Sequence, residues 1–167
     1  MPDGRVAICP GSYDPVTYGH LDIIERASRV FDRVIVGVVN QPVRKQGTLF
    51  TAEERRDFLL QATDKLANVE VDVFDTLLVD FARRHGAGAF VKGLRAISDF
   101  EYEFEMNQLN RKLAADIESV YLMASPEYSF LSSSGIKELA TFGANIDDLV
   151  PGEVARALHD RLSRQRA

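Results

Sequence analysis

The segment from Arg33 to Val39, Arg-Val-Ile-Val-Gly-Val-Val, is apolar at nearly every position. A strand with one face in water alternates apolar and polar residues, whereas a continuous apolar run indicates burial on both faces. Strands of this kind are typical of parallel sheets, because crossover helices cover both sides. The shorter run from Val6 to Cys9 has the same character. These two runs predict buried strands of a parallel α/β sheet.

Helical segments separate the predicted strands. Apolar residues recur at helical spacing at positions 21, 24, 27 and 31, and Thr51-Ala-Glu-Glu54 has the form of a capping box at the start of a second helix. The remaining expected elements are strands over 69–74, 89–91 and 120–124, and helices over 79–85, 99–114 (capped by Asp99), 134–142 and from 151 onward. This alternation predicts a doubly wound, five-stranded parallel sheet with an additional C-terminal helix, and 167 residues fit one domain over 1–167.

Composition narrows the class of protein. The formal net charge of −5 argues against nucleic acid as the main ligand. No apolar run is long enough to span a membrane, and the N-terminus lacks a signal-peptide pattern. Cys9 is the only cysteine, so no disulfide can form within the chain. We therefore expect a cytoplasmic protein with neither nucleic acid nor membrane as a partner.

The loop from Pro10 to His20 reads Pro-Gly-Ser-Tyr-Asp-Pro-Val-Thr-Tyr-Gly-His and joins the first strand to the first helix. A nucleotide commonly binds at such a crossing, where the helix start offers free N–H groups to phosphate. Ser12, Thr17 and His20 add three donors. The loop has neither Gly-Lys-Ser/Thr nor G-x-G-x-x-G, which disfavours a kinase-type P-loop and a dinucleotide dehydrogenase. The alternative is an ordinary turn with a solvent-facing histidine.

This loop resembles the signature of the nucleotidyltransferases with a (T/H)-x-G-H motif, here Thr17-Tyr18-Gly19-His20, and most closely that of the bacterial phosphopantetheine adenylyltransferase family. The resemblance runs over nearly the whole chain. It implies a Rossmann-like nucleotidyltransferase fold and transfer of AMP from ATP to 4′-phosphopantetheine, giving dephospho-coenzyme A and pyrophosphate. It also implies Mg²⁺, bound through substrate phosphates because the sequence shows no carboxylate cage.

A second segment, Lys92-Gly93-Leu94-Arg95, is expected directly after the fourth strand. Two cations around a glycine can clamp phosphate oxygens, although a solvated surface pair is the alternative. The segment matches the family's Arg/Lys-Gly-Leu-Arg pattern. The resemblance implies that Lys92 faces the acceptor phosphate and that Gly93, Leu94 and Arg95 face ATP.

A third segment of hydroxyl and aromatic residues leads into Gly135-Ile136-Lys137. One serine is expected to cap the following helix, which leaves the others unexplained. The stretch resembles the family's Ile-Ser-Ser-Ser/Thr-x-x-Lys/Arg signature, with Leu131 in place of isoleucine. The resemblance assigns to ATP the residues Tyr128, Ser129, Phe130, Leu131, Ser132, Ser133 and Ser134.

The resemblance carries over several further contacts. Those implied for ATP are Ser12, Tyr13, His20 and Glu103; those implied for the acceptor are Ser12, Arg44, Lys45, Leu77, Leu78 and Lys92. Leu77 and Leu78 would pass equally as core leucines, and Glu103 as part of a solvated acidic helix.

The expected reaction needs no general base, because the attacking phosphate arrives ionised. Positioning and charge stabilisation can carry an in-line attack on the α-phosphorus of ATP. His20, Lys92 and Arg95 are the candidates for stabilising the transition state. The alternatives are a related nucleotidyltransferase with another phosphorylated acceptor, such as a pyridine-nucleotide adenylyltransferase or cytidylyltransferase, and a non-catalytic adenine-nucleotide sensor.

The helix expected over 99–114 has two apolar faces. Tyr102, Met106, Leu109 and Leu113 form one stripe, and Phe100 and Phe104 lie on another. A surface helix of a monomer needs one such stripe, so the second indicates burial against another surface. Either face could instead pack within the subunit or line a substrate pocket. The resembled family forms hexamers built as dimers of trimers, and we expect a homo-oligomer of that kind.

Overall fold

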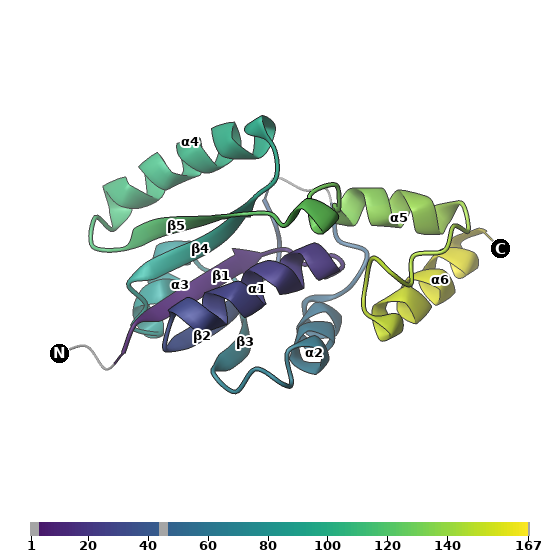
Figure 1. The fold of residues 1–167 in the computed structure, drawn as a ribbon, viewed down its shortest axis with the longest axis horizontal. Helices are drawn as coiled ribbons and strands as arrows, with labels where there is room; N and C mark the ends of the chain where they lie inside the picture. The colour runs from purple at the N-terminus through teal and green to yellow at the C-terminus, as the bar shows by residue number, and fades with distance from the viewer. Residues whose placement is uncertain (1–3, 44–46, 167) are drawn as a thin grey trace.

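The computed structural model describes residues 4–43 and 47–166, and within them the strands form a parallel sheet in the order β3-β2-β1-β4-β5 (Figure 1). The strands are β1 (Val6–Gly11), β2 (Arg33–Val39), β3 (Val69–Phe74), β4 (Ala89–Leu94) and β5 (Glu118–Met123). The helices are α1 (Tyr18–Val30), α2 (Ala52–Ala62), α3 (Leu78–Arg84), α4 (Ile97–Leu113), α5 (Ser133–Thr141) and α6 (Gly152–Arg166), with a 3₁₀ turn η1 (Pro126–Tyr128). The predicted doubly wound sheet with a C-terminal helix is confirmed.

Both faces of the sheet are covered by apolar packing, which explains its unbroken apolar strands. Ala7 and Cys9 of β1 belong to a core on the side of α1 and α2, to which α5 and α6 also contribute. Val6 and Ile8 point the opposite way, into a second core formed with α3. The central strands β1 and β2 are thus buried on both sides, as parallel strands between helix layers must be.

Local signals placed several element boundaries correctly. Thr51 and Glu54 form the predicted capping box, with the Thr51 N–H to Glu54 Oε2 distance at 2.8 Å and the Glu54 N–H to Thr51 Oγ1 distance at 3.1 Å. Ser132 caps α5 by accepting a hydrogen bond from the Gly135 N–H at 3.0 Å. Gly143, just after α5, has φ +77°, a conformation that glycine adopts without strain.

Two boundaries around the second segment differ from the prediction. Strand β4 continues to Leu94, because its pairing with β5 extends as far as Leu94 opposite Met123. Lys92 to Leu94 therefore lie within the strand and not after it. Asp99 does not cap α4, since the N-cap is Ala96 and Asp99 lies in the first helical turn.

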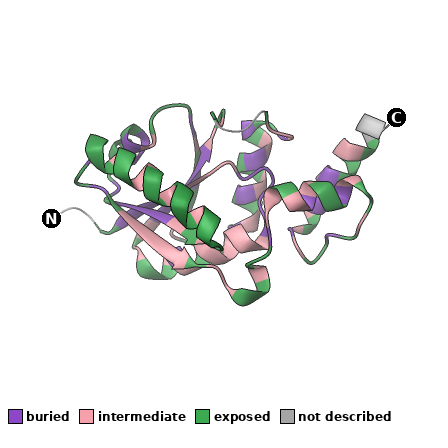
Figure 2. Cartoon of the chain, turned by 90° about the horizontal axis from the view of Figure 1, so that it is seen from above, coloured by how far each residue is buried: buried purple, intermediate pink, exposed green. Residues whose placement is uncertain are grey.

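Helix α4 (Ile97–Leu113) lies largely exposed to solvent. None of its residues is buried, and Figure 2, which views the molecule from above, shows it mostly as exposed or intermediate surface. Ile97, Phe100 and Phe104 are among its exposed apolar side chains. In the part of the chain that the structure describes, no helix is both long enough and apolar enough to cross a membrane.

Candidate active site

The strand order reverses between β1 and β4. The chain passes from β1 to β2 and β3 on one side, and then returns to β4 and β5 on the other. In open α/β sheets, ligands bind in the crevice that such a reversal leaves at the carboxyl ends of the strands. A cavity of about 970 Å³ lies there, lined by the β1–α1 loop, β4, α4 and the loop before α5. Its size suits a nucleotide with a second substrate.

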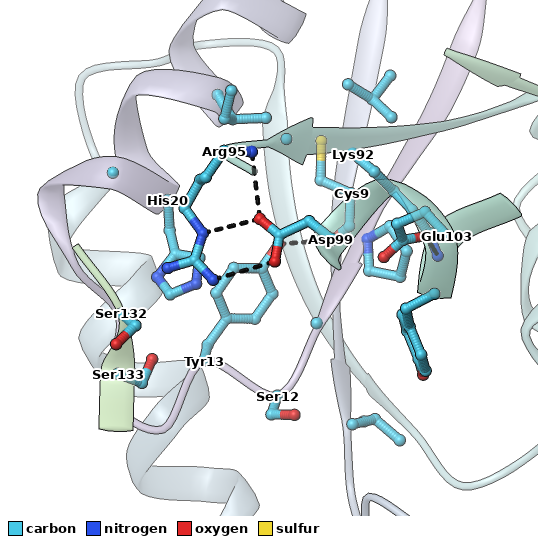
Figure 3. Close-up of a pocket in the computed structure, with 18 of the residues that line it drawn as sticks. Cys9, Ser12, Tyr13, His20, Lys92, Arg95, Asp99, Glu103, Ser132 and Ser133 are labelled. Atoms are coloured by element: carbon cyan, nitrogen blue, oxygen red, sulfur yellow. Dashed lines mark hydrogen bonds and ion pairs between the residues drawn. The ribbon is translucent and has the colours of Figure 1, made fainter. Parts of the chain in front are cut away.

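The cavity brings together all three segments that the sequence singled out. Its wall includes the predicted residues Ser12, Tyr13, His20, Leu78, Lys92, Gly93, Arg95, Glu103, Tyr128, Leu131, Ser132, Ser133 and Ser134. In Figure 3, His20, Ser132 and Ser133 lie toward one side of the view, and Lys92 and Glu103 lie toward the other. The binding role of each residue stays a prediction.

Some predicted residues lie elsewhere. Leu77, Leu94, Ser129 and Phe130 are not part of the cavity wall. The Ser129 hydroxyl donates to the Pro126 carbonyl at 3.0 Å, and Phe130 is exposed beside a smaller apolar hollow on α5. Arg44 and Lys45 lie outside the described residues.

His20 is the third residue of α1 and belongs to a second capping box. Its Nδ1 accepts a hydrogen bond from the Thr17 N–H at 3.0 Å, while Thr17 Oγ1 accepts from the His20 N–H at 3.4 Å. A backbone N–H only donates, so Nδ1 cannot carry a proton in this arrangement. The neutral ring therefore has its proton on Nε2, which makes that nitrogen the donor.

Tyr13 holds the β1–α1 loop in a compact form. It has φ +51°, and its hydroxyl donates to the Cys9 carbonyl at 2.9 Å. A Cβ on Gly11 would lie 3.0 Å from the Tyr13 ring, so a larger residue at this position would push against the ring. Burial, followed by the nearby Cys9, raises the pKa of Tyr13 well above 10.0. The ring faces His20 edge-on at 5.1 Å, so Tyr13 contributes shape more than an ionisable group.

Cys9 also lines the cavity, but its chemistry is that of a core residue. Burial raises the pKa of its thiol to about 12. A thiol of that pKa is protonated at neutral pH and is a poor nucleophile. Cys9 is 2% exposed within β1 and serves as a small core residue.

The two cations of the second segment are each held by a carboxylate from α4. Lys92 Nζ lies 2.5 Å from Glu103 Oε2, and Arg95 Nε lies 3.0 Å from Asp99 Oδ2 (Figure 3). Arg95 also donates through Nη1 to the Leu131 carbonyl, which ties β4 to the third segment. Helix α4 thus orients both cations. The sequence alone did not indicate these two ion pairs, because Glu103 could equally have been a solvated residue of an acidic helix.

The serines of the third segment have distinct environments. Ser132 caps α5, as expected of one of the three. The Ser133 hydroxyl donates to the Pro15 carbonyl at 2.8 Å, so the start of α5 is fastened to the first loop. Ser134 lines the cavity in the first turn of α5. The helix start therefore presents backbone N–H groups at the cavity, where they suit an anion.

Two buried charged residues support these loops and were not among the sequence candidates. Asp14 accepts hydrogen bonds from the N–H groups of Leu49 and Phe50, each at 2.9 Å, and from Lys137 Nζ at 2.9 Å. Burial alone would raise the pKa of Asp14, but these donors outweigh it and hold the pKa below 3.8. Arg55, on the inner face of α2, is 1% exposed.

A protein-built metal cage is missing from the described part of the chain. No group of three or more His, Cys, Asp or Glu side chains there could hold a metal ion. The cavity carboxylates Asp99 and Glu103 are each engaged by a cation. The residues on this wall thus fit an anionic ligand better than a bare divalent cation.

Comparisons with known proteins agree with this geometry. A family model described as Cytidylyltransferase-like matches residues 8–139. Phosphopantetheine adenylyltransferase of Moorella thermoacetica is 54% identical over 157 residues, which cover 94% of this chain and 97% of that protein. The enzyme of the same name from Caldanaerobacter subterraneus is 49% identical over 160 residues, covering 96% and 99%. The chain belongs to the phosphopantetheine adenylyltransferase family.

A solved structure extends the match to the fold. A putative nicotinate-nucleotide adenylyltransferase from Vibrio parahaemolyticus superposes with a TM-score of 0.70 over 96% of both chains, at 17% identity. At that identity the likeness concerns the fold alone. The range matched by the family model, 8–139, contains all three segments that line the cavity.

Proposed function

We propose that the protein transfers the adenylyl group of ATP to 4′-phosphopantetheine, releasing pyrophosphate and forming dephospho-coenzyme A. The observation that carries the proposal is the convergence of His20, Lys92, Arg95 and the start of α5 on one cavity at the strand-order reversal. Relatives named phosphopantetheine adenylyltransferase, at 49–54% identity over nearly the whole chain, support this choice of acceptor.

The reaction follows from these groups. An acceptor phosphate oxygen forms a bond to the α-phosphorus of ATP. The bond from that phosphorus to the oxygen that bridges the α- and β-phosphates breaks, and pyrophosphate leaves with this oxygen. The nucleophile is already ionised, and no covalent enzyme intermediate is formed. Catalysis then requires alignment and stabilisation of the charge on the transferring phosphoryl oxygens. The Nε2–H of His20 and the cations of Lys92 and Arg95 supply that stabilisation in our proposal.

The cavity has walls suited to two different substrates. We assign ATP to the side of His20, Arg95 and the first turn of α5, together with the other predicted ATP residues on the cavity wall. We assign the acceptor phosphate to Lys92, with Ser12 between the two substrates. Tyr102, Met106 and Leu109 of α4 also line the cavity and offer an apolar wall to the pantetheine arm. One of the two apolar faces of α4 is thereby explained within the subunit.

ATP would enter as its Mg²⁺ complex, with the ion held by the phosphates of the nucleotide. The described residues contain no cluster of three or more His, Cys, Asp or Glu side chains that could hold a metal ion, which supports this assignment. The described wall contributes cations, hydroxyls and backbone N–H groups, which are ligands for the phosphate oxygens.

The second apolar face of α4 supports a homo-oligomer. Phe100 and Phe104 are 54% and 55% exposed, and their rings lie 6.0 Å apart. A neighbouring subunit would remove this pair from water. We propose the hexameric assembly that the family resemblance implies. The single cysteine of the chain supports placing the reaction in a reducing cytoplasm.

The test is pyrophosphate release from MgATP with three separate acceptors: 4′-phosphopantetheine, nicotinate mononucleotide and glycerol 3-phosphate. We expect turnover with the first alone, and dephospho-coenzyme A in an amount equal to the pyrophosphate. Preference for either other acceptor would assign the protein to a related nucleotidyltransferase. ATP binding without pyrophosphate release with any acceptor would make it a nucleotide sensor.

A further inference from the structure

The Arg55 side chain donates hydrogen bonds to backbone carbonyls of two loops that are far apart in sequence. Its Nη1 donates to the Ser12 carbonyl at 2.7 Å and to the Val39 carbonyl at 2.9 Å. Its Nη2 donates to the Asn40 carbonyl at 2.9 Å. Its Nε is shared between the carbonyls of Phe50 and Thr51, both at 3.2 Å.

These partners place the guanidinium between the first loop and the β2–α2 connection. Ser12 follows β1, whereas Val39 is the last residue of β2 and Asn40 begins the next loop. Ser12 lines the cavity on one side, and Val39, Pro42 and Val43 line it on another. Arg55 itself is absent from the cavity wall. It can therefore influence a bound substrate only through the loops that it holds.

The chemistry of the site requires arginine. All five partners are carbonyl oxygens, and the planar guanidinium has five N–H groups in a fixed fork. A lysine ammonium has three donors at one point and cannot reach carbonyls on three sides. Two carboxylates offset the buried charge of Arg55: Asp14, which accepts from the Leu49 and Phe50 N–H groups of the same connection, and Glu53.

We propose that Arg55 is a positioning residue that keeps the first loop and the start of the β2–α2 loop at the spacing needed for adenylyl transfer. The inference rests on the proposed function, because that reaction needs ATP and the acceptor aligned across these two loops. A displacement of about 1 Å between reacting groups can cost roughly 10²-fold in rate. Removal of the guanidinium releases both loops at once.

The experiment compares R55K with L59A. Leu59 lies one turn further along α2, is fully buried, and packs in the core on the side of α1 and α2. It is not among the partners of Arg55, so L59A destabilises the helix while keeping the guanidinium and its hydrogen bonds. Both proteins are assayed below their unfolding transitions. We expect kcat/KM for 4′-phosphopantetheine to fall roughly 10–10²-fold in R55K, with wild-type values kept in L59A. Amide hydrogen exchange should rise at residues 12, 13, 39, 40, 41 and 43 in R55K but not in L59A; Pro42 has no amide hydrogen.

Equal kinetic losses in the two variants, or unchanged exchange at both loops in R55K, would overturn the proposal. A wild-type protein without transferase activity would instead overturn the proposed function, and the exchange measurement would still test the tether. Should R55K fail to fold, exchange in the wild-type protein tests the tether. The amides of residues 12 and 13 and those of residues 39, 40, 41 and 43 should then open together as one unit, and independent opening of the two loops refutes a shared tether.

Discussion

Replacing Asp14 with asparagine tests the buried contact on which the loops around the cavity depend. The side chain is 3% exposed, and Asn has nearly the same shape, so the change leaves no cavity. Oδ2 accepts from the Leu49 N–H and Lys137, whereas the one donor to Oδ1 among the described residues is the Phe50 N–H. The asparagine amide nitrogen disrupts the fewest hydrogen bonds at the Oδ1 position. There it opposes the Phe50 N–H, and because both groups are donors that hydrogen bond is lost.

The magnitude follows from that arrangement. An unsatisfied buried N–H costs about 1–3 kcal/mol, and the exchange of a carboxylate for a neutral oxygen against Lys137 adds about 1 kcal/mol. We therefore expect D14N to lower the free energy of unfolding by about 2–4 kcal/mol. K137M is the matched control, because it keeps both backbone hydrogen bonds and removes a cation whose side chain is 31% exposed. It should cost about 1 kcal/mol.

The pH dependence has a definite sign. The folded-state pKa of Asp14 is lowered from 3.8, so the unfolded state takes up the proton more readily. The stabilisation is then fully present above about pH 4 to 5 and is lost as the pH falls through the folded-state pKa. The difference between wild type and D14N should be constant from pH 8 to about pH 5 and shrink below pH 4.

Urea unfolding followed by far-UV circular dichroism is the assay, since the chain has no tryptophan. Both proteins are compared at equal concentration, because oligomerisation would contribute to apparent stability. Three results would refute the reasoning. D14N could lower the free energy of unfolding by less than about 1 kcal/mol, or by no more than K137M does. The difference between wild type and D14N could also stay constant at acid pH.

Three further predictions concern catalysis and assembly. H20A should keep the circular dichroism spectrum but lower kcat for pyrophosphate release by roughly 10²–10³-fold, and an unchanged kcat would remove His20 from the mechanism. K92A should mainly weaken acceptor binding and R95A mainly ATP binding in calorimetry; equal effects on both ligands would contradict the assignment. Sedimentation equilibrium at micromolar concentration should show an oligomer that F104K weakens, because Phe104 is exposed on α4, whereas an 18.6 kDa monomer would contradict the assembly proposal.

The sequence predicted the elements whose causes are local. The segment from Arg33 to Val39 matches β2 residue for residue, because burial on both faces favours apolar residues at every position after Arg33. The Thr51–Glu54 capping box begins α2 where expected, since a cap involves residues only three positions apart. The three segments on the cavity wall were also found from residue type and family resemblance.

Contacts between distant segments were decided by the tertiary structure alone. The length of β4 depends on pairing with β5, and the partners of Lys92 and Arg95 come from α4. Arg55 is the clearest example of a residue whose role the sequence does not indicate. It lies in the charged run Glu-Glu-Arg-Arg, which is typical of the solvent-exposed face of a helix. Its role depends on carbonyls at positions 12, 39, 40, 50 and 51, which only the folded sheet brings within reach of one side chain.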